Sequence, residues 1–217
     1  MSTKDFPSAE GFPGEDLLVL FSRFLTKANT TWMRLTYPFA GFGKGVSIQY
    51  SCDVPRSVSN RMQIGDSVYI AAGTWLTVPE RAVGGATVIS LGNGCKVGRR
   101  CMISAKNRVE LEEDVLLGPS VLITDHSHEF SDINAPIHEQ GLTAGGTVRI
   151  ERNCWLGYGA AVICVSGELV IGRNSVVGAN AVVTRSVPPF SIVAGNPAKV
   201  VRRYDPEARK WCKEGGI

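Results

Sequence analysis

The chain has 217 residues, of which 44% are hydrophobic, enough to bury the core of one domain with small appendages. Its formal net charge is only +3, and Lys and Arg form no long run. Long basic runs of the kind that nucleic-acid or membrane surfaces call for are therefore absent, and neither partner is expected from the charge alone.

The N-terminal segment predicts a helix and no export signal. Its only apolar run, Leu17 to Leu25, is preceded by acidic residues, is short, and is interrupted by Ser22 and Arg23. A signal peptide or a membrane span is therefore not expected, and we expect a cytoplasmic chain. Apolar residues across 15–40 have the spacing of an amphipathic helix, so residues 1–45 are interpreted as a helical cap on the domain that begins at residue 46.

From residue 46 onward an apolar residue recurs every six positions. A period of this kind indicates stacked coils of short parallel strands, in which no coil can bury its inner face alone. The longest uninterrupted run extends from Val46 to Leu76. The sets of three are Val46, Cys52, Val58; Ile64, Ile70, Leu76; Leu91, Val97, Ile103; Leu111, Leu117, Ile123; Ile150, Leu156, Val162; and Ile171, Val177, Val183.

Small residues occupy fixed places in this repeat. Glycine often follows the ladder position, as at Gly98, where we expect a tight corner to need a residue without a Cβ. Four residues after the ladder position the side chain is small or β-branched, and Cys95, Cys101 and Cys154 occur there. The chain has no C-x-x-C pair. We therefore expect reduced thiols that pack inside the coil, with no metal site.

Each interruption of the repeat follows the third member of a set, so all insertions are predicted to leave from one edge of the coil. The longest is the loop 124–149. Residues 46–203 form the predicted β-helix domain. The tail 204–217 is predicted to contain a short helix from Asp205 to Cys212.

Several ordered motifs accompany the six-residue ladder: Ile123 to His128, Cys154 to Gly157, Ile171 to Ala179, and Val193 to Lys199. Together they resemble the left-handed β-helix acyltransferases, in the branch of galactoside, maltose and polysaccharide O-acetyltransferases. The resemblance implies a mostly-β fold, a left-handed parallel β-helix of about six coils with short N- and C-terminal helices. It further implies a homotrimer with sites between subunits and acetyl-CoA as co-substrate.

Acetyl transfer to a hydroxyl needs a group that removes the proton as oxygen attacks the thioester, and imidazole suits this task near neutral pH. The only histidines, His126, His128 and His138, lie in one loop. The resemblance assigns the general base to His126. Asp125, Glu129 and a backbone carbonyl are each candidates to orient it. No nucleophile has an adjacent base, so direct attack without an acyl-enzyme is the simpler mechanism.

The resemblance also distributes the binding residues. Backbone N–H groups near Gly157 or Tyr158 would stabilise the oxyanion. The set assigned to the cofactor is Trp155, Gly157, Ala179, Thr184, Arg185, Lys199 and Arg202, the last four near its adenine and phosphate end. The set assigned to a sugar acceptor is Ser104, Asn107, Asp125 and His128. Ser104 stands where the family has asparagine, which leaves the acceptor open, and Asn107 is expected to point inward.

Three other classes share the coil. A γ-type carbonic anhydrase needs histidines from separate places, whereas these three fall within thirteen residues. A nucleotidyltransferase needs a nucleotide-binding domain before the coil, for which residues 1–45 are too few. A non-catalytic scaffold predicts no CoA binding. Among enzymes, an antibiotic hydroxyl or an amino sugar is the alternative acceptor.

Overall fold

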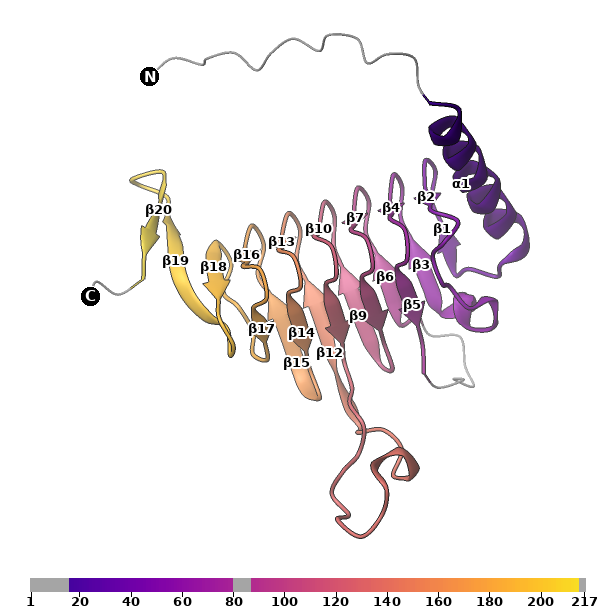
Figure 1. Ribbon diagram of the computed structural model, residues 1–217. Helices are drawn as coiled ribbons and strands as arrows, with labels where there is room; N and C mark the ends of the chain where they lie inside the picture. Colours follow the sequence, from indigo (N-terminus) through magenta and orange to yellow (C-terminus); the bar gives the residue numbers. More distant parts are fainter. Residues whose placement is uncertain (1–15, 80–86, 215–217) are drawn as a thin grey trace.

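The computed structural model describes residues 16–79 and 87–214, and these form a parallel β-helix made of three sheets (Figure 1). The first sheet contains β1 (Gly41–Phe42), β3 (Met62–Ile64), β6 (Ile89–Leu91), β9 (Arg108–Leu111), β12 (Gly145–Ile150) and β15 (Ser166–Ile171). The third contains β5 (Trp75–Thr77), β8 (Met102–Ser104), β11 (Leu122–Thr124), β14 (Ala161–Ile163) and β17 (Val182–Val183). The mostly-strand, parallel architecture expected from the repeat is thus present.

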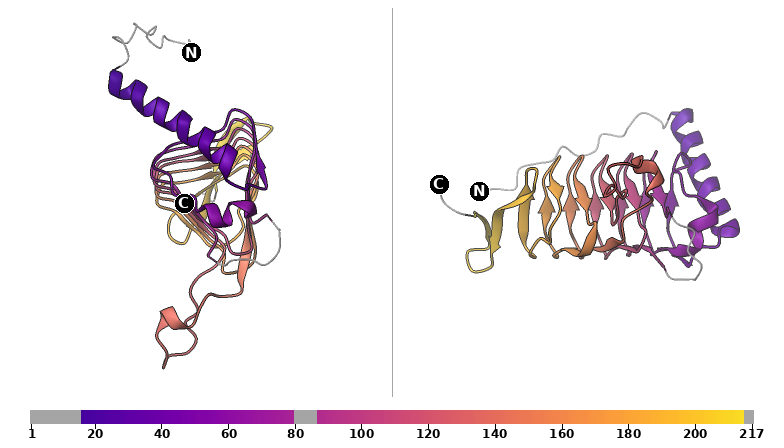
Figure 2. Two further views of the ribbon diagram at one scale, coloured as in Figure 1. Left: turned by 90° about the vertical axis from the view of Figure 1, so that its right-hand side faces the viewer. Right: turned by 90° about the horizontal axis from the view of Figure 1, so that it is seen from below.

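The second sheet has nine strands, of which the first seven are parallel and the last two antiparallel. They are β2 (Ser47–Ile48), β4 (Tyr69–Ile70), β7 (Lys96–Val97), β10 (Leu116–Leu117), β13 (Trp155–Leu156), β16 (Val176–Val177), β18 (Ser191–Ala194), β19 (Lys199–Asp205) and β20 (Lys210–Lys213). Viewed along the stack, the coils superpose in Figure 2.

The predicted ladder positions form the core. In the third sheet Ile103 pairs with Ile123, and Ile123 with Val162, and each of these residues is fully buried. The small residues four positions later are buried as well, Cys95, Cys101 and Cys154 among them. Coil stacking therefore places both rows inside, as the period of six predicts.

The predicted register of the first coil is wrong. Phe42 pairs with Ile64 and Ile48 with Ile70, so the row does not begin at Val46. The third member is Val54, because its neighbour Asp53 bridges Trp75. A 3-10 helix, Arg56–Arg61, then separates Val54 from the next coil. The stretch thought to be uninterrupted therefore contains an insertion, and it too follows the third position of a coil.

Where a glycine follows a ladder position, it is required by the approach of the neighbouring coil and not by its own φ angle. A Cβ on Gly98 would lie 2.6 Å from the carbonyl carbon of Gly118 in the next coil. The left-handed backbone conformation falls two residues later, at Arg100 in this coil and at Asn153 and Asn174 in others. The glycines therefore keep the coils close together, and the corner itself is turned by a polar residue or another glycine.

A long loop leaves the stack between β11 and β12 and projects from one edge, carrying the short 3-10 helix Ile137–Glu139 (Figures 1 and 2). It is shorter than the predicted 124–149, because residues 145–149 already belong to β12. β12 pairs with both β9 and β15, so the base of the loop is anchored on two sides.

The predicted C-terminal helix is also wrong. Strands β19 and β20 form an antiparallel hairpin on β18, and Tyr204 packs edge-on against Trp211 across it, with ring centroids 5.5 Å apart. Pairing with the edge of the second sheet satisfies backbone groups that a short isolated helix would leave to solvent. Residues 215–217 of the expected tail lie outside the described residues.

Helix α1 (Leu17–Thr36) covers the segment where an amphipathic helix is expected, and it lies across the first coil (Figure 2). Thr30 Oγ1 accepts a hydrogen bond from Ile48 N at 2.9 Å, which ties the helix to β2. Residues 1–15 of the expected cap lie outside the described part of the chain. In that part, no helix has both the length and the apolar character needed to cross a membrane.

The interior thiols are expected to resist alkylation in the folded protein. Burial raises the pKa of both Cys95 and Cys154 to about 11. At pH 8 a thiol with that pKa is about 0.1% thiolate, against about a quarter for an unperturbed thiol with a pKa of about 8.5. Iodoacetamide followed by peptide mass spectrometry should find both residues unmodified until the chain is denatured. Stoichiometric labelling of either in the native protein would contradict their structural role.

Candidate active site

The site begins where three strands of the third sheet end side by side. Thr77, Ser104 and Thr124 are the last residues of β5, β8 and β11 and lie in register. Asp125 and His126 follow β11 directly, at the point where the chain enters the projecting loop. The parallel stack therefore holds the start of this loop against the turn that follows β8.

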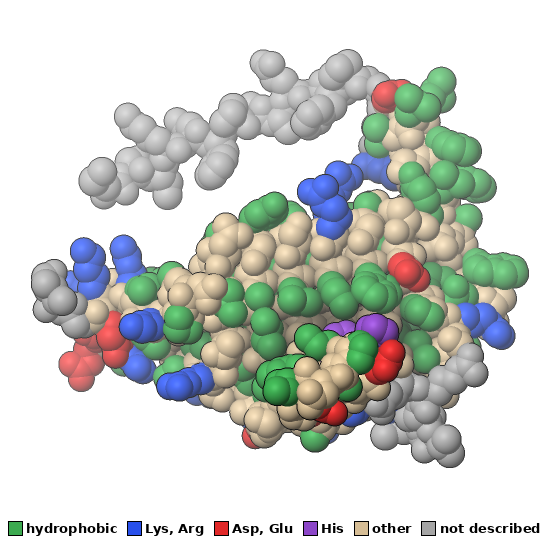
Figure 3. All heavy atoms as spheres, turned by 60° about the horizontal axis from the view of Figure 1, so that its bottom comes forward, with side chains coloured by type: hydrophobic (Ala, Val, Ile, Leu, Met, Phe, Trp, Pro, Cys, Tyr) green, Lys and Arg blue, Asp and Glu red, His purple; other side chains and the backbone are tan. Residues whose placement is uncertain are grey.

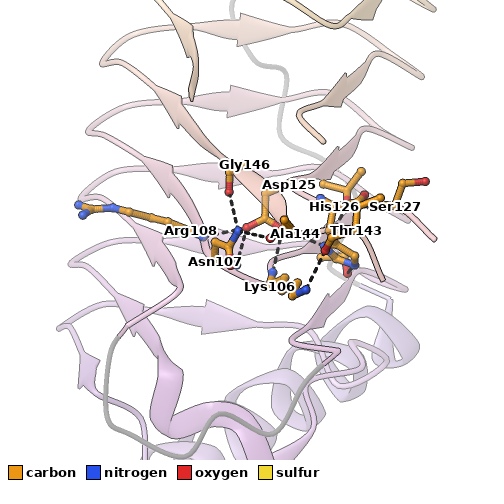
Figure 4. A network of polar contacts seen from close by, with 11 residues as sticks. Lys106, Asn107, Arg108, Asp125, His126, Ser127, Thr143, Ala144 and Gly146 are labelled. Carbon is orange, nitrogen blue, oxygen red and sulfur yellow. Dashed lines mark hydrogen bonds and ion pairs between the residues drawn. The ribbon is translucent and has the colours of Figure 1, made fainter. Parts of the chain in front are cut away.

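Asp125 is fully buried and is held by backbone donors (Figure 4). Its Oδ1 accepts from Lys106 N at 2.8 Å, and its Oδ2 accepts from Asn107 N at 2.7 Å and Arg108 N at 2.8 Å. These three consecutive N–H groups belong to the turn after β8 and to the first residue of β9. They compensate the cost of burying a carboxylate and fix its orientation.

The buried carboxylate also fixes the ring of His126. Nδ1 lies 2.8 Å from Asp125 Oδ1, and the imidazole side chain is 9% exposed. Because an ionised carboxylate only accepts hydrogen bonds, Nδ1 carries the proton of the neutral ring and Nε2 has the free lone pair. Nε2 lies 3.5 Å from Ser104 Oγ. Of the three partners left open by the sequence, the structure brings Asp125 to His126.

The loop base is closed by side chains from the same turn. Lys106 Nζ donates to Thr143 O at 2.7 Å, and Asn107 Nδ2 donates to Ala144 O at 3.0 Å and Gly146 O at 3.2 Å. Asn107 is exposed, so the expectation that it points inward is wrong. The described contacts of its amide tie the returning end of the loop, next to β12, to the turn that follows β8.

The other loop groups lie apart from this pair. His128 is exposed, and its backbone forms a β-bridge with Leu142. His138 is also exposed, and its Nε2 lies 3.7 Å from Glu139 Oε1. Glu129 accepts from the N–H groups of Phe130 and Ser131, and its hydrogen bonds to Ser131 and Phe130 lower the pKa of this carboxyl. Glu129 is thus engaged with its own turn. Figure 3 shows histidine side chains beside apolar residues of the projecting loop.

Two of the three cations assigned to the cofactor's phosphate end line one cavity. A cavity of about 290 Å³ is lined by Thr184, Arg185 and Lys199 together with Pro197 and Ala198. Arg202 does not line it. It lies on β19 opposite Ile192. Thr184 directly follows β17, on the same edge of the third sheet as His126.

The remaining assigned residues lie at the corner that precedes the third sheet. Trp155 is 50% exposed on β13, Gly157 directly follows β13, and Ala179 is an exposed residue in the corner between β16 and β17. The structure thus brings these residues near one another but separates them from His126 by the width of the third sheet. Gly157 N donates to Val177 O at 2.8 Å, so its N–H is not the oxyanion donor that we expected. Tyr158 keeps that assignment as a prediction.

Among the described residues, no group of three or more His, Cys, Asp or Glu side chains is arranged to hold a metal ion.

Comparisons with known proteins agree with the fold. Residues 147–185 match the family model described as hexapeptide repeat of succinyl-transferase. The chain is 32% identical over 136 residues to a putative lipopolysaccharide biosynthesis O-acetyl transferase, WbbJ, of Escherichia coli, covering 59% of this chain and 67% of that protein. It is 31% identical over 160 residues to a probable acetyltransferase of Mycobacterium tuberculosis, covering 74% of this chain and about half (48%) of that protein.

Solved structures share the same architecture. The N-acyltransferase AntD from Bacillus cereus, in complex with dTDP and 3-hydroxybutyryl-CoA, superposes with a TM-score of 0.63 at 17% identity, covering 82% of this chain and 89% of that one. A maltose O-acetyltransferase from Clostridium difficile gives 0.50 at 20% identity, covering 87% and 89%. At these identities the likeness concerns the fold.

The repeat, the stacked sheets and the relatives together define the class: this chain belongs to the hexapeptide-repeat acyltransferase family. Within that family it is an enzyme of the acetyltransferase kind.

Proposed function

We propose that this protein is an acetyl-CoA-dependent O-acetyltransferase acting on a hydroxyl of a sugar or surface-polysaccharide precursor. The observation that supports this most directly is the Asp125–His126 pair. A buried carboxylate held by three backbone donors leaves Nε2 of His126 as a positioned acceptor for a proton. The same arrangement is what a general base for a weakly acidic hydroxyl requires.

In the proposed reaction, the acceptor hydroxyl binds beside His126 Nε2. The hydroxyl oxygen attacks the thioester carbonyl while Nε2 takes the hydroxyl proton, giving a tetrahedral oxyanion and an imidazolium stabilised by Asp125. Collapse of the oxyanion breaks the carbon–sulfur bond, and the departing thiolate receives the proton from His126. The products are the acetyl ester and free CoA. Ser104 lies near Nε2, where its hydroxyl would contact the acceptor.

We assign the adenine and phosphate end of acetyl-CoA to the cavity at Thr184, Arg185 and Lys199, because its two cations suit phosphate groups. β11 and β17 are two steps apart in the third sheet, with β14 between them. At about 4.8 Å per step, Thr184 lies about 10 Å along the stack from Thr124. A pantetheine arm running between these points would present its thioester to the base.

We further propose a left-handed coil of about six turns and a homotrimer in the cytoplasm. Trp155 and Ala179 lie across the third sheet from His126 within one chain. A neighbouring subunit would bring such a corner to His126, so that the site is completed between two chains.

Replacing Arg185 and Lys199 together by alanine is expected to raise the KM for acetyl-CoA. Each charge-assisted hydrogen bond to a phosphate contributes about 1.5 kcal/mol or more, so the rise should be at least about tenfold. Initial rates at varied acetyl-CoA measure it, with exposed Lys210→Ala as the control and Arg202→Ala as a separate test of that assignment. An unchanged KM in the double variant would show that neither side chain binds the cofactor and that both are solvated surface charges.

A crystal structure with CoA and a panel of sugars tests the whole proposal. We expect CoA phosphates at the Arg185 cavity and a sugar hydroxyl within hydrogen-bond distance of His126 Nε2. A sugar bound far from His126, or CoA bound at another corner, would refute it.

A further inference from the structure

Helix α1 packs on the β-helix with its polar side. Its buried residues are Thr26, Thr30 and Met33, and Thr30 Oγ1 exchanges hydrogen bonds with the backbone of Ile48. Asn29 Nδ2 donates to the same carbonyl at 3.3 Å. Two threonines, an asparagine and Met33 thus form the packing face, which is far more polar than that of an ordinary amphipathic helix on a protein core.

The apolar side of the helix consequently faces outward. With about 3.6 residues per turn, one continuous stripe opposite the buried residues remains uncovered. We name it the apolar face, and its members are Leu17, Phe21, Phe24, Ala28, Trp32 and Leu35. The exposed fractions of Phe21, Phe24 and Trp32 are 57%, 65% and 63%. Apolar side chains gather on the outer side of the helix in Figure 3.

A row of cations borders this face. Arg23, Lys27 and Arg34 fall along one flank of α1, which we name the basic edge, and the helix contains no acidic residue between its first and last positions. The basic edge lines a cavity of about 560 Å³ between α1 and the second sheet, together with Gln49 and Tyr69. Arg34 already donates to Gly43 O and lies over the ring of Phe42. The edge therefore combines fixed positive charge with a hollow wide enough for a phosphate group.

We propose that α1 docks on an anionic membrane surface, with its apolar face in the headgroup and acyl boundary and its basic edge among lipid phosphates. An apolar stripe that includes Phe and Trp beside a basic flank is the pattern of helices that lie in this interface. Charge complementarity favours a lipid surface over a second copy of α1. A second α1 would offer apolar side chains but no acidic partner for the basic edge.

Vesicle co-sedimentation of the full chain tests this proposal. The protein should pellet with vesicles of equal parts phosphatidylglycerol and phosphatidylcholine, and high salt should weaken binding. It should stay in solution with phosphatidylcholine alone, and inorganic phosphate at matched ionic strength should not compete. Failure to bind the anionic vesicles at low salt would overturn the proposal. Competition by inorganic phosphate would contradict it too, by showing that the basic edge takes a free ion.

Two variants separate the contributions of the two surfaces. Phe21→Glu with Phe24→Glu should weaken vesicle binding by at least about 100-fold, because two exposed aromatic anchors are lost. Lys27→Glu should weaken it by about tenfold or more. The control is Val201→Glu, an exposed apolar residue on β19 at the other end of the molecule, which should bind as the parent does.

Light scattering of the Phe21→Glu, Phe24→Glu variant decides between occupants. An unchanged molar mass with lost vesicle binding supports the membrane surface. A reduced molar mass would show instead that the apolar face lies between copies of this chain. Retained vesicle binding in a variant with native thermal unfolding would also overturn the proposal.

Discussion

Replacement of His126 by alanine is expected to lower kcat by about 10² to 10⁴, the range found when a positioned general base is removed. The thioester is already a reactive electrophile. The difficult part of the reaction is a hydroxyl far too weakly acidic to ionise near neutral pH. Removing Nε2 therefore affects the chemical step and should leave CoA affinity nearly unchanged. Steady-state kinetics and CoA titration measure the two quantities separately.

His128→Ala is the matched control. His128 is exposed two residues further along, where an extended segment carries it about 6 to 7 Å away. Its loss should change kcat by less than about threefold. If His128→Ala were the inactive variant and His126→Ala remained active, the roles of the two histidines would be reversed.

Replacement of Asp125 by asparagine is expected to lower both stability and kcat. The amide keeps one acceptor oxygen, so at least one buried backbone N–H of Lys106, Asn107 or Arg108 loses its partner. A buried donor left unpaired costs about 1 to 3 kcal/mol. Loss of the carboxylate also frees the imidazole to adopt the other tautomer, and we expect a fall in kcat of about 10² or more. Denaturant unfolding and steady-state rates measure these effects.

The positioning role has a specific readout. If Asp125 acts through His126, the double variant with Asp125→Asn and His126→Ala should have a kcat no lower than that of His126→Ala alone. Asp66→Asn is the control for stability, since exposed Asp66 accepts one backbone N–H, from Lys44 at 2.6 Å. It should cost less than about 1 kcal/mol. Fully additive losses in kcat would show that Asp125 acts independently of the histidine.

The buried residues spaced six positions apart were predictable from the sequence wherever the insertions between coils could be recognised. In the first coil the insertion could not be recognised, because Val46 and Ile48, two apart on an extended strand, point to the same side. Two rows with the same period therefore compete there, and Val58 extends the wrong one by chance. Only pairing with the following coil, Ile48 on Ile70, decides between them.

The sequence motif identified His126 as the candidate base, but it did not identify the groups that hold Asp125 and His126 in place. The turn after β8 cradles Asp125 through backbone N–H groups, and the identity of Lys106 or Arg108 carries no signal of that contact. Stacking of β8 beside β11 creates the contact across nearly twenty positions. The types of side chain in a sequence do not predict which backbone N–H groups will donate to a buried carboxylate.

The C-terminal hairpin shows how a local signal can mislead. Asp205 Oδ1 accepts from the N–H groups of Glu207 and Ala208, the contacts that an N-cap makes at the start of a helix. Here the same contacts close the turn between β19 and β20. The open edge of β18 determines the outcome, because it offers a long row of backbone partners.

The proposed function is tested most directly by acetyl transfer itself, followed by mass spectrometry with acetyl-CoA and a panel of sugars and polysaccharide precursors. We expect a product carrying one added acetyl group that mild alkali removes, as is typical of an ester, and its formation should depend on His126. An alkali-stable product formed on an amine would contradict O-acetylation, and no transfer to any acceptor together with no CoA binding would indicate a scaffold.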